Sequence, residues 1–218
     1  MPPQHIIFIP ALFLLGFISG FCVRAEGGAK SDVFETKPSN RRWPLALALL
    51  TVIVVFVSTH LMPSFGGVHA VERAAHGLPV LDRAPAFDPG EIMQRLESFG
   101  PVGRAAYKRF TYTSDIVFPV TILAFFLLLA RFLRGLRPTK IGWILFIFPS
   151  AWLLTDLAEN VLVYSVIDAF PVVSKAASVL GEVTVAKFTL LFASIIMPML
   201  YLLLLKRRVA KAEGAPGI

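Results

Sequence analysis

Three polar residues stand close together inside an apolar stretch, residues 141–166, and they are the first candidates for chemistry. They are Asp156, Glu159 and Asn160. Spacings of three and four place all three on one face of a helix. Ionisable groups inside a membrane-spanning helix are costly, face the protein interior and mark functional sites by default. We therefore predict that this face of the helix points into a polar centre.

The expected depth of these residues in a bilayer supports a single centre. If each apolar stretch is a helix centred on the midplane, a rise of about 1.5 Å per residue places Asp156 roughly 5 Å from it and Glu159 about 9 Å. Four other embedded residues reach about 11 Å on the same side of the midplane: His60, Asp115, Asn160 and Lys187. Separate helices thus deliver polar side chains to one layer.

Carboxylates beside an ammonium group suit general acid–base chemistry. We assign Asp156 and Glu159 to proton transfer and Lys187 to charge stabilisation, as a hypothesis. The residues predicted to contact a ligand are Arg104, Tyr112, Asp115, Asn160 and His60. Two other interpretations stay open: a buried ion-pair network that fixes helix register, and a path for ions or protons. The path is disfavoured because the inner half of each span lacks matching polar residues.

No cofactor is predicted for this centre. His60 and the carboxylates could offer one nitrogen and several oxygens to a hard or borderline cation, but one histidine without a paired motif is a weak signal. Cys22 is the single cysteine of the chain, so neither an intramolecular disulfide nor a thiolate metal site can form.

The elements that must position these residues follow from composition. The chain has 218 residues, of which 56% are hydrophobic and only 16% charged, and its mean hydropathy is +0.72. Uncharged stretches near the ~20 residues that cross a bilayer predict an all-α, polytopic transmembrane bundle. Its five expected spans are 6–23, 44–62, 112–133, 141–166 and 183–205.

The net charge of +7 is a topology signal rather than a sign of an acidic partner. Residues 24–43, 131–140 and 206–218 carry net charges of +2, +4 and +3, and they flank alternate spans. By the positive-inside rule these segments are cytoplasmic, so the N-terminus lies outside and the C-terminus inside. A nucleic-acid role is excluded because no basic stripe interleaved with aromatic residues accompanies the charge.

Two regions are expected along the chain. Residues 1–43 form a first span and a basic cytoplasmic linker, in which Gly16 and Gly20 could let another membrane helix approach closely. Cleavage of residues 1–23 as a secretory signal is the alternative. Residues 44–218 form a four-helix bundle with a long outer loop, residues 63–111.

The outer loop contains one clear helix signal. Asp88 and Pro89 are a capping residue and a proline at the first helical position, and Gly100 is a stop signal. Because apolar residues follow on one face, we predict an interfacial helix lying in the headgroup region, or a helix that packs on the bundle. The earlier part of the loop is expected to be irregular, and the helix from Pro101 is expected to run without a break into the third span.

The region from residue 44 onward resembles the four-helix sterol-isomerase and sigma-2-receptor group. The likeness lies in its long outer first loop and in an acidic residue, Asp115, shortly before Pro119 in the next span. It implies a pocket for an amphiphile. From the sequence we therefore predict a membrane protein that binds a lipid-like or amphiphilic molecule. Whether it is also an enzyme, with acid–base chemistry by Asp156 and Glu159, is left open; the alternatives are a non-catalytic subunit of a membrane complex and an ion or proton conductor.

Overall fold

The computed structural model describes residues 43–62, 66–136 and 140–213, and this part of the chain is helical without strands. The elements, in chain order, are α2 (Trp43–Phe56), the π-helical turn η2 (Val57–Leu61), α3 (Val68–Ala74), the 3-10 turn η3 (Leu81–Arg83), α4 (Pro89–Ser98), α5 (Gly100–Thr111), α6 (Ser114–Leu136), the 3-10 turn η4 (Lys140–Trp143), α7 (Ile144–Ala169) and α8 (Ala177–Glu213).

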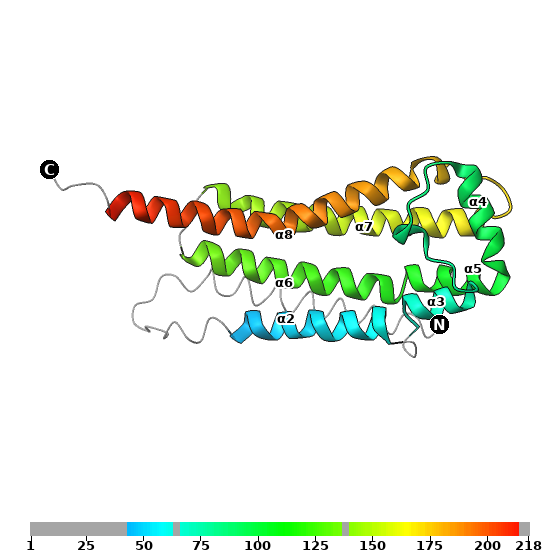
Figure 1. Cartoon of the computed structure of the whole chain (residues 1–218), viewed down its shortest axis with the longest axis horizontal. Helices are drawn as coiled ribbons and strands as arrows, with labels where there is room; N and C mark the ends of the chain where they lie inside the picture. Colours follow the sequence, from blue (N-terminus) through cyan, green and yellow to red (C-terminus); the bar gives the residue numbers. More distant parts are fainter. Residues whose placement is uncertain (1–42, 63–65, 137–139, 214–218) are drawn as a thin grey trace, which may run out of the picture.

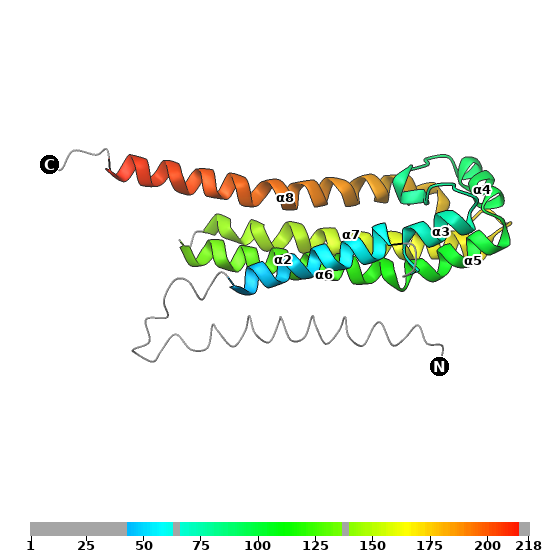
Figure 2. The same cartoon turned by 60° about the horizontal axis from the view of Figure 1, so that its bottom comes forward.

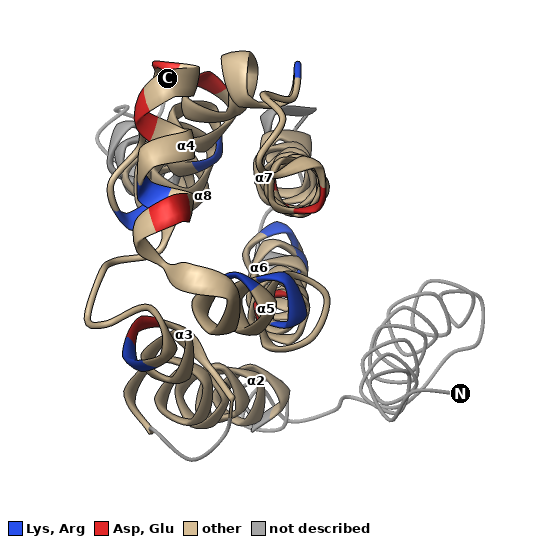
Figure 3. Cartoon of the chain, turned by 90° about the vertical axis from the view of Figure 1, so that its right-hand side faces the viewer, with Lys and Arg blue, Asp and Glu red and all other residues tan. Residues whose placement is uncertain are grey.

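Four long helices, α2, α6, α7 and α8, lie side by side along the long axis of the molecule (Figures 1 and 2). Helix α6 packs between α2 and α7, and α7 makes its most extensive contact with α8. Seen from one end, α2 lies at one edge of this arrangement and α8 at the other (Figure 3). Neighbouring helices of the bundle run antiparallel (Figure 1): short connections join α6 to α7 and α7 to α8, whereas η2, α3, α4 and α5 lie between α2 and α6 along the chain.

Four apolar segments of the described chain are long enough to cross a membrane: Pro44–Leu61, Gly100–Gly135, Ile144–Ala169 and Ala177–Leu204. They correspond to the last four predicted spans and are compatible with an integral membrane protein. Large apolar side chains such as Leu47, Leu154 and Met199 are exposed on them, as expected for helices that face lipid. The predicted first span, 6–23, lies outside the described residues, as do Gly16 and Gly20.

Residues 66–111, which we call the cap, gather at one end of the bundle (Figures 1 and 2). Their apolar side chains form the largest buried cluster of the described chain together with the ends of α7 and α8. Ile92, Leu96 and Phe99 of α4 are at most 1% exposed there, and they pack with Val166 of α7 and Leu180 of α8. The cap therefore shares its core with the bundle instead of building an independent one.

The helix predicted after Asp88 is present. The Asp88 carboxylate accepts a hydrogen bond of 3.2 Å from the Glu91 backbone N–H, and Pro89 occupies the first turn. Gly100 ends α4 with a φ of +64°, a conformation that favours glycine. Because the apolar face of α4 is buried in the cap core, this helix packs on protein, as in the alternative prediction, and its prediction as an interfacial helix is not confirmed.

Two further expectations for this region are corrected. Val68–Ala74 is helical instead of irregular, and burial of Val68 and Val71 stabilises this helix, α3. The helix from Pro101 does not run unbroken into the third span: α5 ends at Thr111, and Tyr112, with φ −114° and ψ 15°, separates it from α6. This break lets α5 pack against α3 while α6 keeps the direction of the bundle.

Residues 78–87, which we call the strap, connect α3 to α4 and cross the start of α8. The Arg95 guanidinium donates to the carbonyls of Pro79 at 3.2 Å, of Val80 at 3.3 Å and of Ala84. A Cβ atom at Gly181 of α8 would lie 2.5 Å from the Ala86 carbonyl oxygen, so the strap touches α8 where only a glycine leaves room. The strap is thus fixed against the bundle.

Candidate functional site

Two pairs of polar residues face each other across the contact between α7 and α8. Asp156 and Glu159 are three residues apart on α7, and Thr184 and Lys187 are three apart on α8, so each pair lies on one helix face. All four side chains are buried, with exposures of 1–5%. The packing of α7 on α8 brings the two faces together near the cap end of the bundle.

Lys187 joins three carboxylates. Its Nζ pairs with Glu159 Oε2, and it lies 3.5 Å from Asp156 Oδ1 and 3.5 Å from Asp82 Oδ2. Thr184 Oγ1 donates to the other oxygen of Glu159. We call Asp82, Asp156, Glu159, Thr184 and Lys187 the polar centre. The structure thus brings together the three residues to which sequence analysis assigned catalysis; their roles are a separate question.

Asp82 is the member that sequence analysis missed. It belongs to η3 in the strap, and its side chain is 24% exposed. The Leu81 backbone N–H beside it donates to the buried Tyr107 hydroxyl at 3.0 Å, and Arg83 turns away to pair with Glu72 at 2.8 Å. One acid in a proline-rich loop gives no signal of its own, because only the folded cap carries it to Lys187.

Charge is unevenly distributed in the polar centre. Three carboxylates lie within ion-pair distance of one ammonium group, and the neighbouring Arg83 is engaged elsewhere. Within the described chain, Asp156 Oδ2 and Asp82 Oδ1 are buried without a hydrogen-bond partner. So is the indole Nε1 of Trp152, one turn from Asp156 on the same face of α7. The polar centre therefore contains two acceptor oxygens, and the neighbouring Trp152 one donor N–H, that make no hydrogen bond to the described residues.

Asn160 and Asp115 border the polar centre. Asn160 Nδ2 donates to the backbone carbonyl of Asp115 at 3.5 Å, which links α7 to the first turn of α6. Asn160 is buried and Asp115 half-buried. Sequence analysis placed both in the same layer as Lys187, and they do lie on adjoining helices at the cap end of the bundle.

His60 has different surroundings. Its Nδ1 lies 2.7 Å from Thr59 Oγ1, and its ring stacks on Phe56 and meets Phe118 edge-on, at centroid distances of 4.9 and 4.6 Å. The imidazole is thus held by a hydroxyl and two aromatic rings at the contact of η2 with α6. Among the described residues, no group of three or more histidine, cysteine or acidic side chains is placed to hold a metal ion.

Arg104 and Tyr112 lie nearer the outer surface of the cap. Arg104 Nη1 donates to the Leu96 carbonyl at 2.8 Å, and its guanidinium lies 4.1 Å from the centre of the Phe170 ring. Tyr112 meets Tyr164 at a centroid distance of 6.0 Å. Both residues help to fix α5 against α7, and neither hydrogen bonds to the polar centre in the described structure.

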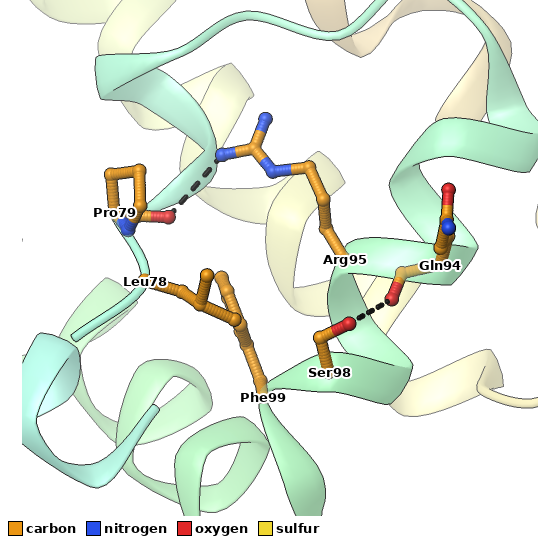
Figure 4. Close-up of a pocket in the computed structure, with 6 residues that line it drawn as sticks. All are labelled: Leu78, Pro79, Gln94, Arg95, Ser98 and Phe99. Atoms are coloured by element: carbon orange, nitrogen blue, oxygen red, sulfur yellow. Dashed lines mark hydrogen bonds between the residues drawn. The ribbon is translucent and has the colours of Figure 1, made fainter. Parts of the chain in front are cut away.

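A pocket of about 140 Å³ lies elsewhere, between the strap and α4. Figure 4 shows Arg95 reaching across it to the Pro79 carbonyl, with Leu78 and Phe99 side by side beneath. Its volume is below the roughly 300 Å³ at which small-molecule pockets begin. Because the guanidinium is already used to hold the strap, this pocket is not the candidate site.

No protein-family model, curated protein or solved structure matches this chain. The topological resemblance to the sterol-isomerase group therefore stays a prediction. The polar centre is the feature of the protein from which a function can be proposed.

Proposed function

We propose that this membrane protein binds an amphiphilic molecule at the polar centre. The observation that carries the proposal is the charge count: three carboxylates surround Lys187 in a buried site at one end of an apolar bundle. One ammonium group does not satisfy all of their oxygens: Asp156 Oδ2 and Asp82 Oδ1 are buried without a hydrogen-bond partner among the described residues, and such acceptors are costly to desolvate. A polar headgroup on an apolar tail is the chemistry that would complete such a site within a membrane.

The orientation of the bundle is a second part of the proposal. Arg131 and Arg134 of α6 and the basic residues 206–211 of α8 lie at the ends of these helices away from the cap (Figure 1), and the positive-inside rule would make that side cytoplasmic. The polar centre would then open toward the outer leaflet. In a chain with Cys22 replaced by Ser, Gly135→Cys should react with a membrane-impermeant thiol reagent only after the membrane is opened; reaction in sealed cells would reverse the topology.

A conducting role finds less support in the structure. The buried hydroxyls of Thr121, in the cap-side half of α6, and of Ser194, near the middle of α8, donate to the carbonyls of Phe118 and Leu190 in their own helices. The buried charged side chains of the described residues are Asp156, Glu159 and Lys187, all near the cap. The polar groups thus form a site with one side rather than a path across the bundle.

Acid–base chemistry would extend the binding role. Glu159 is occupied by Lys187 and Thr184 on both of its oxygens, whereas Asp156 retains an oxygen without a partner. Asp156 is therefore the carboxylate that we propose to exchange a proton with a bound molecule, and Glu159 the one that holds Lys187 in place.

The same ion pairs favour a second candidate, a structural staple in a subunit of a larger complex. Lys187 joins α8 to α7 and to the strap, so the centre also ties the cap to the bundle. In this case binding would be absent, and the polar centre would contribute only to folding and to helix register.

Identification of co-purified lipid separates the two candidates. The full chain and a variant with Asp156→Leu, Glu159→Leu and Lys187→Met are purified in mild detergent, and their bound lipids are identified by mass spectrometry. Apolar replacement of a whole buried ion network is often tolerated, so the variant should fold. We expect the wild type to retain an amphiphile that the variant loses.

A matched control carries Lys175→Met and Glu182→Gln, which change charged residues on the surface near the start of α8. It should retain the wild-type lipid. Identical lipid profiles for the wild type and the folded triple variant would contradict binding at the polar centre and support the staple.

A further inference from the structure

Two buried polar atoms on α7 remain without partners in the described structure: the Trp152 indole Nε1 and Asp156 Oδ2. Trp152 is 3% exposed and Asp156 5% exposed, so neither atom can be satisfied by bulk solvent. Residues four apart on a helix lie on one face, about 6 Å apart along the axis. The two atoms therefore border one region of the contact between α7 and its neighbours.

Other polar atoms on this part of α7 are satisfied within the protein. The Thr155 hydroxyl donates to the Ala151 carbonyl at 2.9 Å, and Asp156 Oδ1 lies 3.5 Å from Lys187 Nζ. Buried polar groups in folded proteins are almost always hydrogen-bonded, and each exception requires an explanation. Here the exceptions are one donor and one acceptor, and they lie a single turn apart.

The chemistry of the two atoms restricts what could satisfy both. An indole N–H only donates, and an ionised carboxylate oxygen only accepts. An ammonium group offers donors alone, and an ionised phosphate offers acceptors alone. A hydroxyl group accepts through its oxygen and donates its hydrogen, so it alone among these headgroups can bond to both atoms.

From this pairing we infer that the amphiphile of the proposed function carries a hydroxyl headgroup. Its oxygen accepts from Trp152 Nε1, and its hydrogen is donated to Asp156 Oδ2. Val120 and Leu123 of α6 and Leu153 of α7 form a buried apolar cluster, and Leu153 follows Trp152 directly in α7. An aliphatic tail suits such surroundings, so the ligand class is a long-chain alcohol. This inference depends on the proposed function, since it names the molecule that the polar centre binds.

The test compares three probes with the same tail and different headgroups. Hexadecanol can donate and accept, hexadecyl methyl ether can only accept, and protonated hexadecylamine can only donate. Their binding to the full chain in lipid nanodiscs is measured by native mass spectrometry. We expect hexadecanol to bind about tenfold more tightly than either of the others, which corresponds to one well-made hydrogen bond to a charged group.

Two substitutions and one matched control assign the effect to these atoms. Trp152→Phe removes the indole N–H but keeps an aromatic ring. It should weaken binding of both hexadecanol and its ether about tenfold, because both oxygens accept from this donor, and leave binding of the amine nearly unchanged. Asp156→Leu should remove the preference for the alcohol. Trp143→Phe changes a tryptophan that is 57% exposed at the other end of α7, and it should bind like the wild type.

The outcomes separate this inference from the proposed function. Equal affinities for hexadecanol and its ether, tighter binding of the amine, or wild-type binding by a folded Trp152→Phe variant would each overturn the hydroxyl assignment and leave amphiphile binding standing. If only a water molecule bridges Trp152 and Asp156, hexadecanol will not bind, and this result would also overturn the hydroxyl assignment. If none of the probes binds and no amphiphile co-purifies with the wild type, the proposed function falls as well.

Discussion

The two ends of the bundle differ in the surroundings that they offer to apolar and charged side chains. At the cap end, apolar residues from α3, α4, α5, α7 and α8 share one core, and Lys187 joins three acids beneath it. Away from the cap, large side chains such as Ile147, Phe192 and Leu203 are exposed, and the buried Ser194 hydroxyl bonds within its own helix. Lipid can solvate the second region but not the first.

This difference indicates where specific structure is concentrated. A helix in lipid satisfies its own backbone, so the segment away from the cap needs apolar composition and only a small buried cluster, formed by Ala130, Leu133, Leu145 and Tyr201. The cap end must also compensate charges and fill a core, and both requirements depend on residues from distant parts of the chain. The same substitution should therefore have unequal effects at the two ends.

Loss of Lys187 should be the most damaging change. Lys187→Met leaves Glu159 and Asp156 buried without their cation, and breaking a buried pair in this way typically costs about 3–5 kcal/mol. Thermal unfolding of the purified protein in detergent measures the loss. Lys175→Met, at an exposed lysine just before α8, should unfold like the wild type. Equal stability of the two variants would contradict a stabilising role of Lys187.

The cap core provides the next test. Leu96 is 0% exposed and Leu154 is 68% exposed, so the two leucines sample the two kinds of surroundings. Leu96→Ala leaves a cavity and should cost about 2–5 kcal/mol, whereas Leu154→Ala on the surface should change stability by less than about 0.5 kcal/mol. Chemical denaturation followed by circular dichroism compares them. Similar losses would mean that the cap is no better packed than the lipid-facing surface.

Asp82 tests whether the polar centre holds the strap. Asp82→Asn removes one charge from a partly exposed ion pair, for which we expect a loss of about 1–2 kcal/mol and easier opening of the strap. Limited proteolysis should cut near residues 83–87 faster than in the wild type. Glu182→Gln, at an exposed acid of α8, supplies the control, and unchanged cutting in Asp82→Asn would show that Arg95 alone suffices.

The smallest expected effect concerns the start of α4. Asp88→Ala removes the carboxylate that accepts from the Glu91 N–H, and loss of such a helix N-cap hydrogen bond costs about 0.5–1 kcal/mol. The loss is measured as a decrease in unfolding temperature. Asp88→Ser should unfold at nearly the wild-type temperature, because serine also caps helices. If Asp88→Ala lost more stability than Leu96→Ala, the N-cap hydrogen bond of α4 would contribute more to the cap than its core packing does.

Much of the fold could be predicted from local patterns. Hydropathy located four apolar helices, and the capping signal at Asp88 gave the start of α4 at the correct residue. The break at Tyr112 and the helix after Gly67 could not be predicted, because both depend on how α3 packs on α5 and η2. The buried face of α4 had two possible neighbours, lipid or protein, and its sequence pattern is the same for both.

For the candidate site, the sequence by itself determined which helix faces carry the polar residues. The spacing of Asp156, Glu159 and Asn160 is a property of the helical period, and the cost of placing ions in an apolar span makes their burial together expected. Only the tertiary structure decided that Lys187 meets Glu159, that Asp82 joins them from the strap, and that His60 lies among aromatic rings. It also decided that the Trp152 indole N–H has no hydrogen-bond partner among the described residues. The physical reason is range: helix period and hydropathy act over a few residues, whereas these contacts depend on how separate helices and the cap pack against one another.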